Sequence, residues 1–183
     1  MIRKFFTGIA MILVATGFPF LPSASAVAQT GEAELSPVAR SHYQQGFSFV
    51  ATAKNSKNSQ NRQEMLNNAI NEFTLAIKEA PTFADAYSNR AVAYMQQNKM
   101  NKAEEDLKKA IELDPKNPFA HYNLASLYSL TKKVDLALDQ IDASLANGFD
   151  RYDELRNDPD LANVRKNPEF RKVLEKHKVF VMK

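Results

Sequence analysis

The stretch AEEDLKKAIELDPKNP, residues 103–118, repeats the pattern of AINEFTLAIKEAPTFA, residues 69–84. Three residues recur 34 positions later: Ala69 as Ala103, Ala76 as Ala110 and Pro81 as Pro115. The same step carries Leu107 to Ile141 and Ala103 to Ala137. A fixed period of this length indicates stacked supersecondary units, none of which buries its apolar face alone.

Apolar residues recur at helical spacing through these units, and no segment alternates convincingly with period two. We therefore predict an all-α fold. Its antiparallel helix pairs are expected at 37–54 with 61–80, 83–97 with 100–113, and 118–131 with 134–147. The polar run KNSKNSQNR at residues 54–62 predicts either a loop or two frayed helix ends.

Several helix ends carry their own signals. Ser36-Pro37 and Asn117-Pro118 each place a capping residue before a first-turn proline, which predicts the start of a helix. Asn98 can supply a left-handed residue at a helix end, and Asn147-Gly148 is typical of the end of the last pair.

Residues 84–117 resemble a tetratricopeptide repeat (TPR) over its full length. Residues 118–151 resemble a second repeat, with the matching positions His121, Leu124, Ala125, Tyr128, Ala137 and Ile141. Residues 40–80 resemble a degenerate copy with about 11 extra residues, because Gly46 aligns with Ala91 only after that insertion. The resemblance implies an α-solenoid of three helix pairs over residues 37–149, divided as 37–80, 83–117 and 118–149.

Small residues stand where two helices must approach closely. By this interpretation the contact positions are Gly46, Ala91 and Ala125 in the first helices and Ala103 and Ala137 in the second helices. Pro81 and Pro115 end the second helix of their pairs. We interpret all seven positions as structural.

Residues 150–183 resemble a helical extension that follows TPR arrays in bacterial proteins, and the open end of a solenoid requires such a cap. Its apolar side is expected to consist of Leu155, Leu161, Val164, Phe170, Val173 and Leu174. The basic run at 165–178 is interpreted as the outer face of an amphipathic cap helix. Attraction to an anionic membrane surface or an acidic partner is the alternative.

Residues 1–28 have the order of a secretory signal peptide: Arg3 and Lys4, then an apolar run, then small residues. Cleavage is expected before Val27 or before Gln29, with an uncleaved anchor as the alternative, and residues 29–36 are predicted to be a flexible leader. The expected destination is the periplasm, with the thylakoid lumen left open. The remaining 22 basic and 21 acidic residues give a charge of +1, which offers no electrostatic basis for binding nucleic acid. The absence of Cys excludes disulfides, thiol catalysis and thiolate metal sites.

The search for catalytic or metal-binding groups finds little. His42, His121 and His177 lie on separate predicted elements without metal-ligand spacing, and we attribute His42 and His121 to packing at equivalent repeat positions. Glu104, Glu105 and Asp106 splay around one helix and are interpreted as a solvated face. With no glycine-rich phosphate motif either, we expect no enzyme activity, no cofactor and no metal.

The resemblance implies a concave groove, lined by the first helices, that holds a protein or peptide segment. By register its residues are Arg40, Tyr43, Gln44, Phe47, Asp85, Ser88, Asn89, Val92, Gln96, Phe119, Tyr122, Asn123 and Ser126. Asn89 and Asn123 are expected to bond a peptide backbone, and Tyr43, Phe119 and Tyr122 to anchor it. Phe119 and Asn123 occupy two positions where carboxylate-clamping versions of this fold carry Lys or Arg, which argues against such a clamp.

The sequence thus favours a non-catalytic exported scaffold that serves an envelope or thylakoid assembly. A self-associating structural protein is the alternative, and a small hydrolase or metal-binding protein ranks last.

Overall fold

The computed structural model describes residues 35–179, and all regular structure in that range is helical. The helices are α1 (Pro37–Asn55), α2 (Ser59–Glu79), α3 (Ala84–Gln96), α4 (Met100–Leu113), α5 (Pro118–Leu130), α6 (Val134–Ala146), α7 (Tyr152–Asn157) and α8 (Pro168–Lys176). Two short 3₁₀ turns, η2 (Pro159–Leu161) and η3 (Val164–Lys166), lie between α7 and α8. The predicted signal peptide and most of the predicted leader lie outside the described residues.

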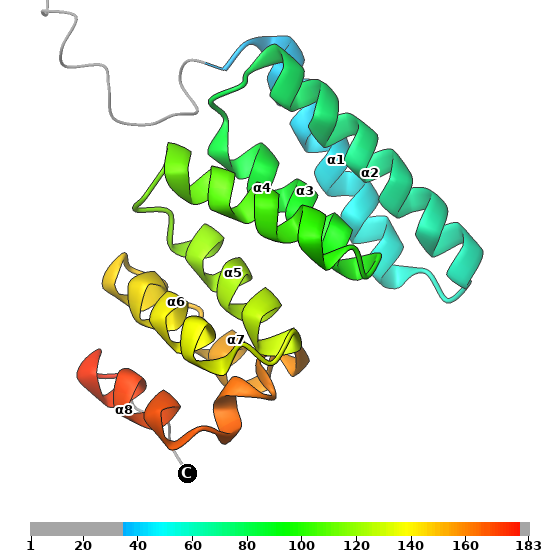
Figure 1. The fold of residues 1–183 in the computed structure, drawn as a ribbon. Coiled ribbons are helices and arrows are strands. Elements are labelled where there is room, and N and C mark those ends of the chain that lie inside the picture. Colours follow the sequence, from blue (N-terminus) through cyan, green and yellow to red (C-terminus); the bar gives the residue numbers. More distant parts are fainter. Residues whose placement is uncertain (1–34, 180–183) are drawn as a thin grey trace, which may run out of the picture. The chain divides into compact units, whose positions relative to one another are not determined.

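Three antiparallel helix pairs, α1 with α2, α3 with α4 and α5 with α6, follow one another along the chain (Figure 1). The first helices of the pairs contact each other, α1 against α3 and α3 against α5, while α2 packs on α3 and α4 on α5. The predicted all-α solenoid is therefore confirmed. None of the helices in this range is long and apolar enough to cross a membrane.

The helix ends follow the predicted signals. The Ser36 hydroxyl accepts a hydrogen bond from the Ala39 amide, and the Asn117 side chain accepts from the amides of Phe119 and Ala120. Asn98 adopts a left-handed φ of 58° and Gly148 a φ of 92°. Lys132, which the sequence did not single out, has a φ of 61° and stands one full repeat after Asn98.

The small contact positions are all buried: Ala91, Ala103, Ala125 and Ala137 have no exposed surface. Gly46 faces the ring of Phe73, and a methyl group added at Gly46 would lie 2.7 Å from the nearest ring carbon. This distance is far below normal van der Waals contact, so the backbones of α1 and α2 approach as closely as glycine allows.

One predicted boundary needs correction, and the structure decides between the two alternatives for the polar run at residues 54–62. Leu35 is partly buried against the cluster of Ala76, Phe83 and Ala86, so the last residues of the predicted leader belong to the fold. Helix α1 continues to Asn55 and α2 begins at Ser59, which leaves three residues between them. The polar run therefore forms helix ends rather than a loop, and the insertion lengthens both helices of the first pair.

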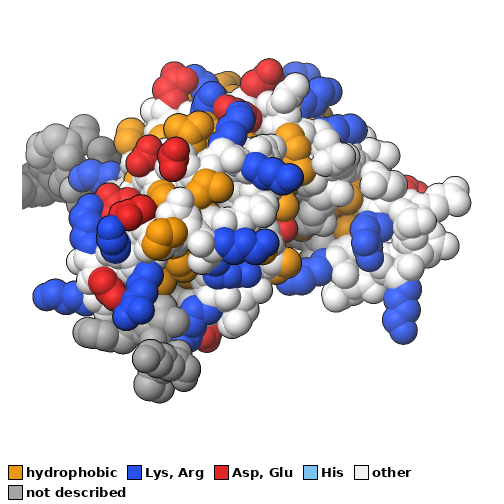
Figure 2. Space-filling view, turned by 60° about the horizontal axis from the view of Figure 1, so that its bottom comes forward, with side chains coloured by type: hydrophobic (Ala, Val, Ile, Leu, Met, Phe, Trp, Pro, Cys, Tyr) orange, Lys and Arg blue, Asp and Glu red, His pale blue; other side chains and the backbone are white. Residues whose placement is uncertain are grey.

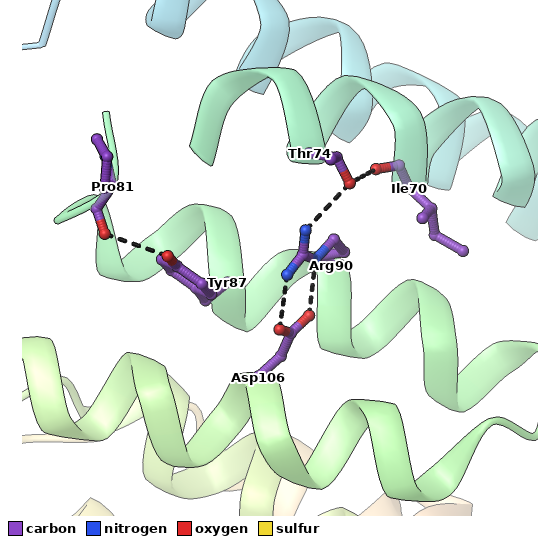
Figure 3. Close-up of polar contacts among 6 residues, drawn as sticks. All are labelled: Ile70, Thr74, Pro81, Tyr87, Arg90 and Asp106. Atoms are coloured by element: carbon purple, nitrogen blue, oxygen red, sulfur yellow. Dashed lines mark hydrogen bonds and ion pairs between the residues drawn. The ribbon is translucent and has the colours of Figure 1, made fainter. Parts of the chain in front are cut away.

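The solvated-face interpretation is wrong for Asp106. This side chain is buried, and its two carboxylate oxygens accept from Nε and Nη2 of Arg90 at 2.8 Å each (Figure 3). The third guanidinium nitrogen donates to the Thr74 hydroxyl at 3.0 Å, so Arg90 joins α2, α3 and α4. Burial alone would lower the pKa of Arg90, but its bonds to Asp106 outweigh this and raise it. Glu104 is also engaged, with Lys108 and Lys133.

The histidines in the repeats have the packing role that we expected. His121 Nε2 lies 3.0 Å from the Pro115 carbonyl oxygen, and the Tyr87 hydroxyl donates to the Pro81 carbonyl at 3.2 Å, which is the same contact one repeat earlier (Figure 3). His42 lies 2.7 Å from Glu72 and joins α1 to α2. The His42 contact thus holds the first helix of its pair on the second, whereas the contacts of Tyr87 and His121 hold α3 and α5 on the turns that precede them.

The segment after α6 covers the end of the stack. Leu155, Leu161 and Val164 are fully buried, Phe170 and Leu174 nearly so, and Val173 packs against the same cluster. The Asp158 carboxylate accepts from the Asp160 amide and the Asn167 side chain from the Glu169 amide, so each caps the element that begins at the proline after it. The extension thus supplies the apolar surface that a final repeat would otherwise lack.

About half of the predicted basic face is paired with acidic side chains. Arg171 pairs with Glu175, Lys172 with Glu169, and both Lys176 and His177 with Asp142 on α6. On the face shown in Figure 2, acidic side chains lie among the Lys and Arg side chains, with hydrophobic side chains between them. Among the described residues of the run, Arg165, Lys166 and Lys178 have no carboxylate partner, so part of the basic face stays unpaired.

Candidate binding groove

A groove of about 840 Å³ runs between the first helices and the C-terminal extension. Helix α3 contributes Val92, Met95 and Gln96, α5 contributes Tyr122, Asn123, Ser126 and Leu130, and Lys54 and Met100 lie at its border. The opposite wall comes from the extension, through Asp153, Glu154, Asn157, Asp158, Pro159 and Asp160. The groove thus has an apolar, methionine-containing floor and an acidic wall, and Met side chains adapt readily to different ligands.

The predicted groove residues divide into two sets. Val92, Gln96, Tyr122, Asn123 and Ser126 line the groove. The others do not: Arg40, Tyr43, Gln44, Phe47, Asp85, Ser88, Asn89 and Phe119 lie elsewhere on or between the first helices. Phe47 is 59% exposed and Phe119 40%, with the Arg151 guanidinium 4.6 Å from the centre of the Phe119 ring.

Asn89 and Asn123 each form a side-chain hydrogen bond to the first helix of the preceding pair. Asn89 Nδ2 donates to the Tyr43 hydroxyl at 3.0 Å, and Asn123 Nδ2 donates to Ser88 Oγ at 3.1 Å. Tyr43 and Ser88 hold the same repeat position, so these are one contact repeated along the stack. Both amide nitrogens that we expected to bond a peptide therefore already hold neighbouring helices together.

Tyr122 occupies that same position in the third repeat, and it is 5% exposed. Its hydroxyl donates to Asp158 Oδ2 at 2.5 Å, and its ring stacks on Phe149 with centroids 4.5 Å apart. Burial and this hydrogen bond raise the pKa of Tyr122 well above its ordinary value. The structure thus places Tyr122 in an internal contact, not on the free anchoring surface that the sequence analysis expected, and Ser88 is likewise 4% exposed.

The acidic wall is the part of the groove that sequence reasoning missed. A signal for it was present, because Asn157 follows Asn123 by one full repeat and α7 begins the same interval after α5. Helix α7 thus stands where a fourth first helix would begin, and Asp158-Pro159 ends it after six residues. Inside the array, the asparagine of the following repeat bonds the residue at the position of Tyr122. Here Asp158, the residue after Asn157, takes that role and accepts the hydrogen bond of Tyr122.

No metal centre is formed by the described residues, since no three of their His, Asp or Glu side chains come together in a suitable group. What the groove offers is shape, apolar area and carboxylates.

Comparison with known proteins agrees with this geometry. One tetratricopeptide repeat family model matches residues 84–117, and another matches residues 107–139. The chain contains tetratricopeptide repeats. The chain is 48% identical over 48 residues to Tetratricopeptide repeat protein 36 of Caenorhabditis elegans and 34% identical over 56 residues to a chloroplastic protein of Arabidopsis thaliana. These matches cover 26% and 31% of this chain but only 27% and 17% of the relatives.

Solved TPR structures extend the likeness over most of the chain. A thermophilic TPR protein of Thermus thermophilus matches with a TM-score of 0.60 at 21% identity, over 75% of this chain and 64% of that one. The TPR2AB domain of yeast Sti1, solved as a pHSP90 complex, matches with a TM-score of 0.54 at 25% identity, over 80% of this chain and 49% of that one. The first of these supports the fold alone.

Proposed function

We propose that the chain is a non-catalytic scaffold that binds a segment of a partner protein in the groove between α3, α5 and the C-terminal extension. The observation that carries the proposal is the groove itself, an open space of about 840 Å³ with an apolar floor and a polar wall. This volume lies in the range of specific ligand sites. The Sti1 match supports the same interpretation, because that domain was solved with a protein partner.

Site-specific crosslinking tests the proposal. A photoreactive amino acid at Gln96, which is exposed and lines the groove, is expected to capture a defined partner in the cells of origin. The same amino acid at Leu136, 45% exposed on α6 and outside the groove, is the matched control. A second substitution, Val92→Arg, fills the groove floor and is expected to abolish the adduct at position 96. Equal labelling from positions 96 and 136, or an adduct that survives Val92→Arg, would contradict groove binding.

Self-association is the alternative function, and the exposure of Phe47 favours it. This side chain is 59% exposed on α1, outside the groove, where a second copy would cover it. Light scattering at several concentrations separates the two proposals, because a molecular mass that rises with concentration and is restored to the monomer value by Phe47→Ser supports assembly. A constant monomer mass excludes it.

We also propose that the scaffold acts after export, in an envelope or thylakoid assembly. The order of residues 1–28 supports this proposal, and one relative is chloroplastic by name. Mass spectrometry of the protein from its native source is expected to give an N-terminus at Val27 or Gln29. An intact Met1 in the native protein would contradict cleavage.

A further inference from the structure

The charges in the groove are strongly unequal. Among the described residues, four carboxylates line it, those of Asp153, Glu154, Asp158 and Asp160, against the single ammonium group of Lys54. All four acids come from the extension, so the groove has one acidic wall. A groove of this kind repels an acidic segment and attracts a cationic one.

Two of the acids are compensated by their own neighbours. Asp153 forms an ion pair with Arg156 and Glu154 one with Arg151, both within the extension. Asp158 and Asp160 form no ion pair with any residue that the structure describes. Asp158 accepts hydrogen bonds from the Tyr122 hydroxyl and the Asp160 amide, which carry no charge. The Arg165 guanidinium donates to the main-chain oxygens of Leu155 and Asp158, not to a carboxylate.

Asp160 is the least satisfied acid of the wall. Its carboxylate has no hydrogen bond or ion pair among the contacts of residues 35–179, and it is half-buried. Burial, together with the charge of Asp158, raises the pKa of Asp160. A cation placed between the two carboxylates would remove this repulsion and supply charge-assisted hydrogen bonds.

A second, independent feature of the groove also indicates a ligand. Ser126 lines the floor, is 3% exposed, and is the one buried side chain of the described range whose polar atom has no hydrogen-bond partner. The Ser126 hydroxyl is near the Tyr122 hydroxyl and acts to lower the pKa of Tyr122, but the Tyr122 hydroxyl donates its proton to Asp158, so no hydrogen bond of normal geometry reaches Ser126 Oγ. A buried hydroxyl of this kind is costly unless a binding partner satisfies it.

We propose that the groove binds a protein segment carrying an arginine or lysine side chain, with its cationic group between the carboxylates of Asp158 and Asp160. The aliphatic part of that side chain lies along Val92, Met95 and Leu130, and a polar group of the segment reaches Ser126. This inference rests on the proposed function, because it names the class of segment that the groove takes.

Three labelled peptides that differ at one position test the charge preference: GSLARLSG, GSLAQLSG and GSLAELSG. Their binding to the purified protein is followed by fluorescence anisotropy. The arginine peptide is expected to bind about tenfold more tightly than the glutamine peptide, and the glutamate peptide more weakly than both. Added salt is expected to reduce the difference in affinity between the arginine and glutamate peptides.

The matched variants locate the effect. Asp160→Asn keeps the side-chain shape and is expected to bring the arginine peptide to within about twofold of the glutamine peptide. Asp139→Asn makes the same chemical change at an exposed site on α6 outside the groove and is expected to leave all three affinities unchanged. Equal affinities for the three peptides, binding of none of them, or the same response in both variants would overturn the inference. The crosslinking at Gln96 is judged separately, so a groove that captures a partner without charge preference would sustain the proposed function alone.

Discussion

The first and second repeats meet the same packing requirement with different residues. In the first repeat Gly46 lies against the ring of Phe73, whereas the register of the second pairs Ala91 with Leu107 and that of the third pairs Ala125 with Ile141. The pair with the smaller small residue, glycine, has the larger partner, phenylalanine. All six residues of the three pairs are buried. The family pattern thus specifies a combined volume between two helices, not a residue at each position.

The polar contacts between paired helices show the same substitution of partners. Glu72, Asp106 and Gln140 hold one repeat position on the three second helices and contact His42, Arg90 and His121. Tyr87 holds the histidine position in the second repeat, and Arg90, one turn further along α3, takes over as the partner. The second repeat therefore has the more buried ion pair, with side chains 16% and 10% exposed against 26% and 20% for His42 and Glu72.

The largest expected effect comes from breaking that buried ion pair. Arg90→Met leaves the Asp106 carboxylate buried without a counter-ion and is expected to lower the free energy of unfolding by about 3–5 kcal/mol. The matched change His42→Leu breaks the more exposed contact of the first repeat and should cost about 1 kcal/mol or less. Urea unfolding of both variants measures the difference. Similar losses of unfolding free energy in the two variants would show that the deeper burial of the Arg90–Asp106 pair does not make it more important for stability.

The double variant Arg90→Met with Asp106→Leu sharpens this test. It removes both charges and fills the space with apolar atoms, so most of the lost stability should return. The single variant Arg90→Met and the double variant both lose the hydrogen bond from Arg90 to Thr74. Its contribution therefore cancels when their free energies of unfolding are compared.

An intermediate effect is expected at the glycine of the first repeat. Gly46→Ala forces a methyl group against Phe73 and should destabilise the protein by about 1–3 kcal/mol, although alanine favours an isolated helix by about 1 kcal/mol. Adding Phe73→Leu converts the pair to the residues of the second repeat and should recover much of the loss. A double-mutant cycle measures this coupling, and simple additivity of the two changes would refute volume compensation.

The sequence was sufficient for the helix pairs because its strongest signals are local or periodic. The small residues that recur once per repeat, the capping residues before Pro37 and Pro118, and the left-handed Asn98 each act within one turn or one repeat. Such features are specified by neighbours in the chain, so they can be recognised from the sequence alone.

The binding groove was harder to predict because it depends on how the extension folds back. Val92, Asn123 and Ser126, which the family register selected, line the groove, but the register treated Tyr122 as free. Nothing local to Tyr122 shows that Asp158, far along the chain, will accept its hydrogen bond. The burial of Asp106 was missed for the same reason, since three consecutive acids are a typical exposed pattern and the partner Arg90 lies on another helix.

The smallest expected effect concerns the other end of the stack, where the extension docks through exposed charges. Asp142 on α6 lies 2.7 Å from both Lys176 Nζ and His177 Nε2, and its hydrogen bonds to these two groups lower its pKa. Because its folded pKa lies below the unfolded value of about 3.9, its contribution is present above that pH and is lost as the pH falls through the folded pKa.

Asp142→Asn should therefore lower the free energy of unfolding by up to about 1 kcal/mol near pH 6, since the contact is partly exposed. The difference from the unchanged protein should shrink toward zero as the pH is lowered through about 4 toward 3, and urea unfolding across that range measures it. Asp139→Asn, on the same helix but exposed, controls for the change in net charge. A difference that stays constant over this range would mean that the ionised carboxylate of Asp142, unlike that of Asp106 in the second repeat, contributes nothing measurable to stability.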